Sequence, residues 1–416
     1  MKTASGTKTS MRKRVLLFRF SSGSSIHSAL VGMLFTLACL LVAQEPATMR
    51  QILAGTMPPS VEVTTFEHSE KLYPFRRVPR GASVRSMPLA PNQLRDVRFA
   101  SGSKNYDLFD YLADDRIAGL LVLKDGKIAF EDYELGMTPS TRWASFSMAK
   151  SVSSTLVGAA LQQGRISSLD ASLSRYVPTL KGGGYEGVTV RNLLQMASGV
   201  KWDETYTNPE SDVSKLGLLL LAQKPGVVVS YMRALPKAGA PGSIWNYSTG
   251  ETYLIGAVIE GATHEPLATY LSETLWSRLG MEQDATWWLE SPGGMGLAGS
   301  GIGATLRDYA RFGLFVQQDG MIDGQQIVPQ GWFRAAGSAH VINGKSVDYG
   351  YLWWPLRAGD PIHQGAFEAR GIYGQHLYIN PNEKLVIVVL SARSKPTRAT
   401  VVDDAAFFAA VARALR

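Results

Sequence analysis

Apolar residues gather in short blocks near both ends of the chain, and these blocks predict paired β-strands. Residues 117–130 hold two apolar runs on either side of Asp125-Gly126, a dipeptide that favours a tight hairpin turn. Residues 376–390 repeat this arrangement around Pro381-Asn382. We therefore expect one β-hairpin near each end of the folded body.

Helical spacing of apolar residues dominates between these hairpins and returns after the second one. From about residue 147 to residue 333, helical patterns are interrupted by many Gly and Pro residues, and residues 401–415 carry apolar side chains at helical intervals. Strands at both ends with helices between them predict an α+β fold. In this fold an antiparallel sheet built from both chain ends is flanked by helices and carries an inserted helical subdomain.

The patterns divide the 416-residue chain into three parts. Residues 1–43 form a leader. Residues 44–95 are rich in Pro, Arg and Ser with weak periodicity, which is typical of a linker or of an N-terminal extension lying over the main body. Residues 96–416 form the main domain, with the helical subdomain at about 160–335, and this length is sufficient to bury a substantial core.

The leader has the features of an export signal. A basic segment precedes an apolar run at residues 29–43, whose length suits a signal-peptide core better than a full membrane span. Neither Ala43 nor Ala47 has a small residue two places before it, so an uncleaved signal anchor is an alternative to a cleaved peptide. A buried core helix fits the basic segment less well. We expect an exported protein, periplasmic or extracellular, that contacts a membrane only through this segment.

The net charge of +7 belongs almost entirely to the leader. Six basic residues and no acidic residue precede Ala43, so the remaining chain is nearly neutral and we expect no nucleic-acid partner. Cys39 is the only cysteine and lies in the apolar run, so neither a disulfide framework nor cysteine chemistry is expected. The oligomeric state stays open.

A Ser-x-x-Lys pattern provides the first candidate for catalysis. The pattern occurs at five positions, but only at Ser147 does it open a helix with an apolar stripe. The other four serines lie in the leader or in segments rich in Gly and Ser: Ser5, Ser10, Ser101 and Ser198. Lys150 follows Ser147 by three residues and therefore lies on the same helix face, within reach of its hydroxyl.

This pair has the properties of a nucleophile and its base. The helix N-terminus favours the negative charge that develops on an oxyanion, and partial burial lowers the pKa of a lysine toward neutrality. On this evidence alone, a serine that only caps a helix and is followed by a surface lysine is an equal alternative.

Two further segments add groups to the pair. Tyr247 lies in a loop immediately before an apolar helix, where it can relay a proton between the serine and a leaving group. Gly371 and Gly374 punctuate residues 369–375, which we interpret as the start of a strand whose free N–H can bond a substrate carbonyl. A core or rim tyrosine and a simple turn or bulge are the structural alternatives.

Other catalytic chemistries lack their residues in this sequence. The six histidines show no metal-ligand spacing, so we expect no metal and no cofactor. A Ser-His-Asp triad would need a Gly-x-Ser-x-Gly elbow, and Gly299-Ser300-Gly301 lacks the required spacing.

Together these segments resemble the serine β-lactamase and penicillin-recognising superfamily, in particular its class C-like branch, which includes esterases and 6-aminohexanoate-dimer hydrolases. The resemblance covers roughly residues 110–390. It is carried by Ser147-x-x-Lys150, Tyr247-Ser-Thr249 and residues 371–375, and residues 202–206 are among its supporting marks. It implies a β-lactamase-like fold for the predicted α+β domain.

The resemblance also implies a role for each residue. Ser147 is acylated, Lys150 accepts its proton, and Tyr247 passes a proton to the leaving group. The backbone N–H groups of Ser147 and Ile372 form the oxyanion hole, and Tyr206 contacts the scissile amide. The implied activity is hydrolysis of a small amide or ester through an acyl-enzyme.

Three positions depart from the family pattern. Thr249 stands where the family usually has asparagine, so a hydroxyl replaces the amide that would hold the substrate. Ala369-Arg370-Gly371 replaces the usual Lys-Thr-Gly, whose lysine helps to bind the carboxylate of β-lactams, and Arg370 can substitute only if its side chain faces the cleft. Ser211-Asp212-Val213 resembles a Ser-Asp-Asn box without its asparagine, so we interpret Ser211 as a loop or cap residue.

These features leave three functions open. The first is an amidase or esterase acting on a small molecule, which the departures favour. The second is a β-lactamase or a D,D-peptidase acting on cell-wall peptides. The third is a binding or sensor domain that has the fold without catalysis.

Overall fold

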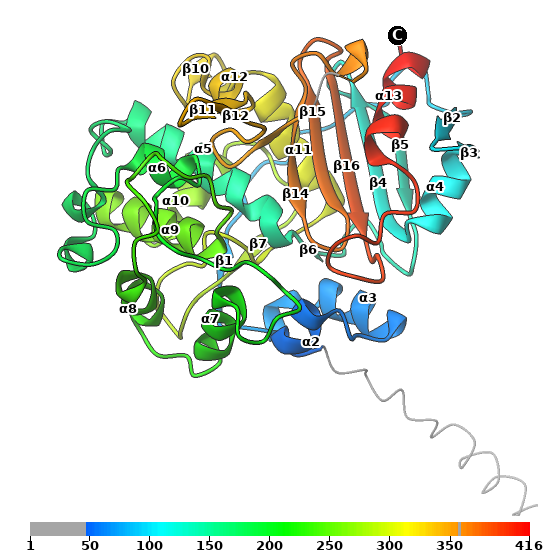
Figure 1. Cartoon of the computed structure of the whole chain (residues 1–416). Helices are drawn as coiled ribbons and strands as arrows, with labels where there is room; N and C mark the ends of the chain where they lie inside the picture. The colour runs from blue at the N-terminus through cyan, green and yellow to red at the C-terminus, as the bar shows by residue number, and fades with distance from the viewer. Residues whose placement is uncertain (1–46, 357–358) are drawn as a thin grey trace, which may run out of the picture. The chain divides into compact units, whose positions relative to one another are not determined.

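Strands from the two ends of the described chain join in one six-stranded antiparallel sheet (Figure 1). The computed structural model describes residues 47–356 and 359–416, so the leader predicted at 1–43 lies outside the described residues. In order across the sheet, the strands are β13 (Trp354–Pro355), β14 (Phe367–Gly371), β15 (Gln375–Asn380), β16 (Leu385–Ser391), β4 (Ile117–Lys124) and β5 (Lys127–Tyr133). This sheet confirms the predicted fold class.

Both predicted hairpins are present in the sheet. Asp125 and Gly126 join β4 to β5 with φ angles of 52° and 75°, as a two-residue turn with both residues in the left-handed region requires. Residues 381–384 join β15 to β16, so the second turn includes Pro381 and Asn382 as expected.

The central strands have a hydrophobic core on each face. Along β16, Val386, Val388 and Leu390 belong to the larger core cluster, on the side of the helical region. Leu385, Ile387 and Val389 belong to the smaller one on the opposite face. Because successive side chains of a strand point to opposite faces, a strand buried on both sides consists almost entirely of apolar residues.

The two faces of the six-stranded sheet are covered by different sets of helices (Figure 1). On the smaller core lie α4 (Leu108–Asp114), the hairpin of β2 (Arg98–Ser101) and β3 (Lys104–Asp107), and α13 (Asp404–Ala414), which confirms the predicted C-terminal helix. On the larger core, α11 packs directly on β4, β15 and β16, and α5 packs against α9. The helices of this side are α5 (Ala149–Gln162), α6 (Val190–Leu194), α7 (Asp212–Leu220), α8 (Val227–Ala234), α9 (Thr249–Thr263), α10 (Leu267–Leu271), α11 (Leu306–Gln317) and α12 (Trp332–Ala336).

Several short elements complete the described chain. They are the pairs β9 (Met321–Ile322) with β10 (Gln325–Gln326) and β11 (His340–Ile342) with β12 (Lys345–Val347), together with the helical turns η1 (Ser69–Lys71), η2 (Phe146–Met148), η3 (Leu173–Arg175), η4 (Pro178–Leu180), η5 (Ser272–Trp276) and η6 (Pro361–His363). Ser211 accepts a hydrogen bond from the Ser214 backbone N–H and is the N-cap of α7, which confirms its interpretation as a cap residue.

A second, four-stranded sheet takes two of its strands, β7 and β8, from the part of the chain expected to be helical. Its strands, in order, are β1 (Phe75–Val78), β7 (Ala285–Trp288), β8 (Ile302–Ala304) and β6 (Trp143–Ala144). The β6 strand ends three residues before Ser147, and Ser145 N–H donates to the Ile302 carbonyl at 2.8 Å. This sheet therefore anchors the chain immediately before the candidate nucleophile.

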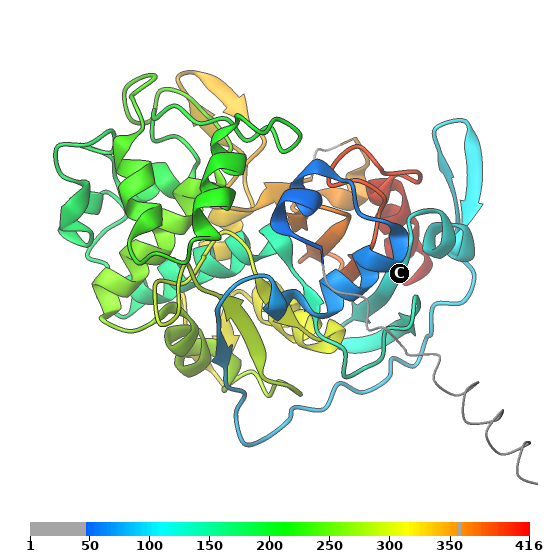
Figure 2. The same cartoon turned by 90° about the horizontal axis from the view of Figure 1, so that it is seen from below.

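The segment predicted as a linker or N-terminal extension contains regular structure from residue 49 onward. The α2 helix (Met49–Ala54) packs against α7, and α3 (Pro59–Glu67) follows it. After β1, residues 79–97 run along the outside of the molecule to β2 (Figure 2). Within the described residues, none of the helices combines the length and the apolar character needed to cross a membrane.

Candidate active site

Ser147 lies in the helical turn η2, which leads directly into α5. Phe146, immediately before it, has a φ of 44°, a left-handed conformation that costs a residue with a large side chain about 1–2 kcal/mol. The Phe146 ring packs against Phe66 and Tyr373, with centroid distances of 5.0 and 5.8 Å. These contacts hold the strained backbone and thereby fix the direction of the Ser147 side chain.

Lys150, in the first turn of α5, is almost completely buried and points at Ser147. Its ammonium donates three hydrogen bonds: to Ser147 Oγ at 3.0 Å, to Thr249 Oγ1 at 3.0 Å and to the Gly299 carbonyl at 2.9 Å. Burial lowers the pKa of Lys150 to about 8, against the opposing influence of the Glu204 charge. A lysine with this pKa is partly neutral near physiological pH and can accept a proton.

Glu204 is a site residue that the sequence interpretation did not identify. One carboxylate oxygen accepts hydrogen bonds from the Thr249 hydroxyl and, at 3.0 Å, from the Tyr206 hydroxyl. The other accepts from the Trp202 indole N–H at 2.5 Å and from the Thr249 backbone N–H at 2.9 Å. The Thr249 hydroxyl thus lies between the Lys150 ammonium and the Glu204 carboxylate.

Tyr247 lies in the loop that ends where α9 begins, as the sequence predicts. Its ring stacks on Trp354 with a centroid distance of 5.7 Å, and the Lys150 ammonium lies 5.2 Å from its centroid. Burial and then the Glu204 charge raise the pKa of Tyr247 well above its usual value, whereas a hydrogen bond with the Ser147 side chain lowers it. The Tyr247 phenol is therefore next to both Ser147 and Lys150.

Residues 369–375, which the sequence pattern indicated as the start of one strand, span three elements: 369–371 end β14, 372–374 form the turn, and Gln375 begins β15. Tyr373 and Gly374 have φ angles of 64° and 83°, which a tight hairpin turn requires. Gly371 ends β14, and a Cβ there would lie 2.5 Å from the Ser145 carbonyl oxygen. Only glycine permits this close approach, which brings Ile372 beside Ser147 on the wall of one pocket.

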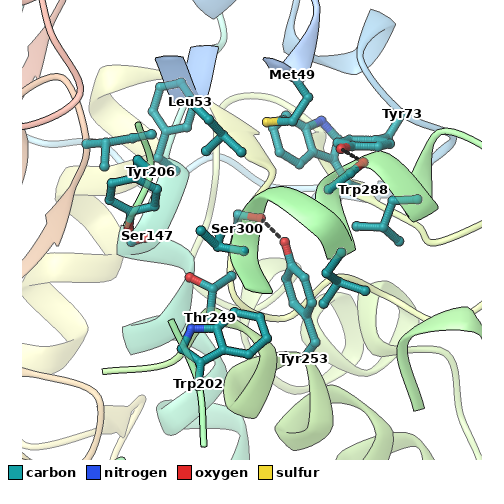
Figure 3. A pocket seen from close by; sticks show the side chains of 16 residues that line it. Met49, Leu53, Tyr73, Ser147, Trp202, Tyr206, Thr249, Tyr253, Trp288 and Ser300 are labelled. Carbon is teal, nitrogen blue, oxygen red and sulfur yellow. Dashed lines mark hydrogen bonds between the residues drawn. The ribbon is translucent and has the colours of Figure 1, made fainter. Parts of the chain in front are cut away.

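This pocket lies in front of Ser147 (Figure 3). Tyr206 and Thr249 also line it, so the structure brings together every residue that the sequence proposed for the site, with Tyr247 and Lys150 directly behind the pocket wall. Sixteen residues line the pocket, and none of them carries a charge. The α2 helix contributes Met49 and Leu53.

Arg370 does not offer a free positive charge to the site. Its guanidinium pairs with Glu368 at 2.5 Å and lies 5.4 Å from the ring centroid of Trp354. Ala369, between them, is fully buried in the larger core. The position where the resemblance implies a carboxylate-binding lysine thus holds an apolar residue, and the neighbouring arginine is already paired.

The described residues contain no group of three or more His, Cys, Asp or Glu side chains arranged to hold a metal ion. The groups available for chemistry in this pocket are therefore a hydroxyl, an ammonium, a phenol and backbone N–H groups. This set suits transfer of an acyl group to a serine.

Comparison with known proteins agrees with this geometry. The family described as beta-lactamase matches residues 108–411. The chain belongs to the beta-lactamase family. A 6-aminohexanoate-dimer hydrolase from Paenarthrobacter ureafaciens is 28% identical over 334 residues, which are 77% of this chain and 83% of the relative.

Solved structures share the fold of this beta-lactamase family member. A protein from Bacillus anthracis, provisionally assigned as a 6-aminohexanoate-dimer hydrolase, aligns with a TM-score of 0.77 and 24% identity, covering 89% of this chain and 98% of that one. A family VIII carboxylesterase aligns with a TM-score of 0.56 and 15% identity over 71% of this chain and 92% of its own. The family and its hydrolase relatives together support a hydrolase activity in general terms.

Proposed function

We propose that this protein is a serine hydrolase that cleaves an ester or amide bond of a small substrate through an acyl-enzyme on Ser147. The observation that carries the proposal is the 3.0 Å hydrogen bond from Lys150 to Ser147, made by a buried lysine whose pKa is lowered to about 8. Burial without a direct carboxylate partner disfavours the charged form of this lysine, which suits a proton acceptor.

In the proposed reaction, neutral Lys150 accepts the Ser147 proton while Oγ attacks the substrate carbonyl. The carbonyl oxygen takes up the negative charge, which the backbone N–H groups of Ser147 and Ile372 stabilise. The bond to the leaving group then breaks, and the leaving alcohol or amine receives a proton through Tyr247. A water molecule then attacks the acyl carbon while the same groups accept its proton, the bond from this carbon to Ser147 Oγ breaks, and Oγ takes up that proton as the acid leaves.

The relatives support an ester or amide substrate, since one is a 6-aminohexanoate-dimer hydrolase and another is a carboxylesterase. The sequence relatives also include a beta-lactamase from Pseudomonas fluorescens, 26% identical over 178 residues, which keeps β-lactam hydrolysis as a second candidate. The apolar Ala369 and the paired Arg370 favour the first candidate, because the carboxylate of a β-lactam would lack its cation.

Covalent labelling tests the proposal. We expect a fluorophosphonate probe to label the protein and Ser147→Ala to abolish both the label and the turnover of p-nitrophenyl acetate. Absence of labelling in the folded wild-type protein would contradict catalysis and favour the binding module. Turnover of nitrocefin at a rate comparable to that of the ester would favour the β-lactamase instead.

A further inference from the structure

We propose that the pocket in front of Ser147 binds an uncharged, apolar chain of the substrate, and that Gly217 on α7, opposite α2, sets the length of chain that fits. This inference rests on the proposed serine hydrolase. It adds the class of substrate and a residue that determines specificity.

The pocket offers almost no polar group to a ligand apart from Ser147 (Figure 3). The Tyr253 hydroxyl bonds to Ser300 Oγ at 3.0 Å, and the Tyr73 hydroxyl donates to the Gly217 carbonyl at 3.4 Å. The polar groups of Trp202, Tyr206 and Thr249 are bonded to Glu204, and the Trp288 indole N–H donates to the Ser69 carbonyl. A charged substrate group entering this pocket would lose its hydration without gaining a partner.

Two helices contribute apolar side chains to the wall of the pocket. From α7 come Val213, Leu216 and Leu220, and from α2 come Met49 and Leu53. The α2 helix belongs to the segment before the catalytic domain, so this segment completes the pocket rather than only covering the surface.

An outer groove continues from the pocket between the same two helices. Met49, Leu53, Tyr206 and Gly217 line both cavities, whereas Arg50 and Glu210 line only the outer one. The inner pocket is therefore uncharged and the outer groove carries charges. Gly217 lies at the passage between them.

Gly217 has no backbone reason to be glycine. It lies inside α7, where glycine is among the least favourable residues, and its φ is not in the left-handed region. A Cβ at this position would point at α2, 3.7 Å from Leu53 Cδ1 and 3.9 Å from Met49 Cγ. A methyl group would fit, but a larger side chain would fill the passage.

Chain-length series test the proposal in the wild-type protein. With p-nitrophenyl esters from acetate to decanoate, we expect kcat/KM to rise several-fold per pair of methylenes and then to level off. A parallel series of alkyl acetates distinguishes an acyl chain in the pocket from an alcohol chain. In a matched pair, p-nitrophenyl hexanoate should be cleaved at least ~10-fold faster than p-nitrophenyl 6-aminohexanoate, whose ammonium cannot be accommodated.

Substitutions at Gly217 test its role through a ratio that does not depend on the amount of folded protein. We expect Gly217→Leu to lower the ratio of octanoate to acetate kcat/KM at least ~10-fold, and Gly217→Ala to lower it less. The matched control is Leu219→Ala, on the same helix but exposed and outside both cavities, which should leave the ratio unchanged.

The outcomes separate this inference from the proposed function. If neither series depends on chain length, or if the charged hexanoate is cleaved as well as the neutral one, the apolar-chain site is wrong, although labelling of Ser147 would still support a serine hydrolase. If Gly217→Leu leaves the ratio unchanged, Gly217 does not set the length. Absence of both labelling and ester turnover would instead contradict the proposed function itself.

Discussion

Two charge clusters, one behind the pocket and one between the sheet and α13, hold ionisable groups in different ways. The front cluster, Lys150, Thr249 and Glu204, lies behind the pocket. Its ammonium and its carboxylate are separated by the Thr249 hydroxyl, which accepts from Lys150 and donates to Glu204. No direct ion pair between Lys150 and Glu204 is present, and burial dominates the pKa of Lys150, which is lowered to about 8.

The back cluster, Glu368, His376, Arg393 and Asp404, lies between the sheet and α13. His376 bonds to Glu368 at 2.7 Å and pairs with Asp404 at 3.3 Å, and Arg393 binds Asp404 at 2.6 Å. Burial alone would lower the pKa of His376, but Asp404 and Glu368 outweigh it and raise the pKa to about 9. The pKa of Asp404 is held far below its usual value, although burial would raise it, because His376 and Arg393 are in contact with it.

The comparison shows how a buried ionisable group is kept either reactive or fixed. Direct contact with an opposite charge stabilises the ionised form and removes the group from proton transfer near neutral pH. An intervening hydroxyl transmits only part of that stabilisation, so the pKa of the lysine remains close to the working pH, as a general base requires. We therefore expect the back cluster to control stability and the front cluster to control rate.

The largest effect should come from breaking the back cluster. Asp404→Ala leaves His376 and Arg393 buried with fewer partners, and we expect it to lower the free energy of unfolding by about 3–5 kcal/mol. Urea denaturation measures this change. The control is Glu210→Ala, whose exposed pair with Lys215 should contribute less than about 1 kcal/mol. Equal effects of the two substitutions would remove the distinction between this cluster and a surface ion pair.

Removing the proton-transfer groups should cost rate rather than stability. We expect Lys150→Ala and Tyr247→Phe each to lower kcat/KM for a p-nitrophenyl ester by about 100-fold or more, the usual contribution of an acid–base group. Lys150→Met provides a variant of similar volume, which separates the lost amine from the cavity left by alanine. Near-normal rates in the Lys150→Met and Tyr247→Phe variants would exclude the proposed base and proton relay.

The elements whose structure depends only on residues near each other in the chain were predictable from the sequence. The Asp125-Gly126 turn and the apolar strands on either side of it define the first hairpin without reference to the rest of the chain. The second sheet was not predictable, because β6 and β8 contain only two and three residues and are too short to show a period. The glycines of residues 369–375 suit a strand start and a tight turn equally, so the sequence did not distinguish the turn at Tyr373-Gly374 from the strand that begins after it.

The candidate site also has one part that was predictable from the sequence and another that was not. Ser147 and Lys150 lie in one helical turn, so their spacing in the sequence indicates their contact. Glu204 lies 45 residues from Thr249, and nothing in its own segment shows that its carboxylate meets that hydroxyl. The pairing of Arg370 with Glu368 likewise depends on which face of β14 the two side chains share.

The most specific test of how the front cluster differs from the back cluster is a change in the pH dependence of kcat/KM. The Glu204 charge raises the pKa of Lys150, so Glu204→Gln should lower it further and shift the pH at which the base becomes active. In the wild-type protein we expect kcat/KM to rise with pH through an apparent pKa of about 8, because deprotonated Lys150 is the active form. In Glu204→Gln the same rise should occur at lower pH, by up to about one pH unit.

The sign of this shift distinguishes the two possible roles of Glu204. The hydroxyls of Thr249 and Tyr206 donate to Glu204, and each can also accept from the glutamine amide, so the pocket can retain its hydrogen bonds when the charge is removed. If Glu204 acts through its charge, the Glu204→Gln profile moves to lower pH, while Glu210→Gln, on the same loop but exposed, leaves the profile in place. If Glu204 only positions Thr249 and Tyr206, the plateau rate falls and the apparent pKa stays near that of the wild type. A profile displaced to higher pH would contradict the electrostatic argument, because it would mean that the carboxylate had been favouring neutral lysine.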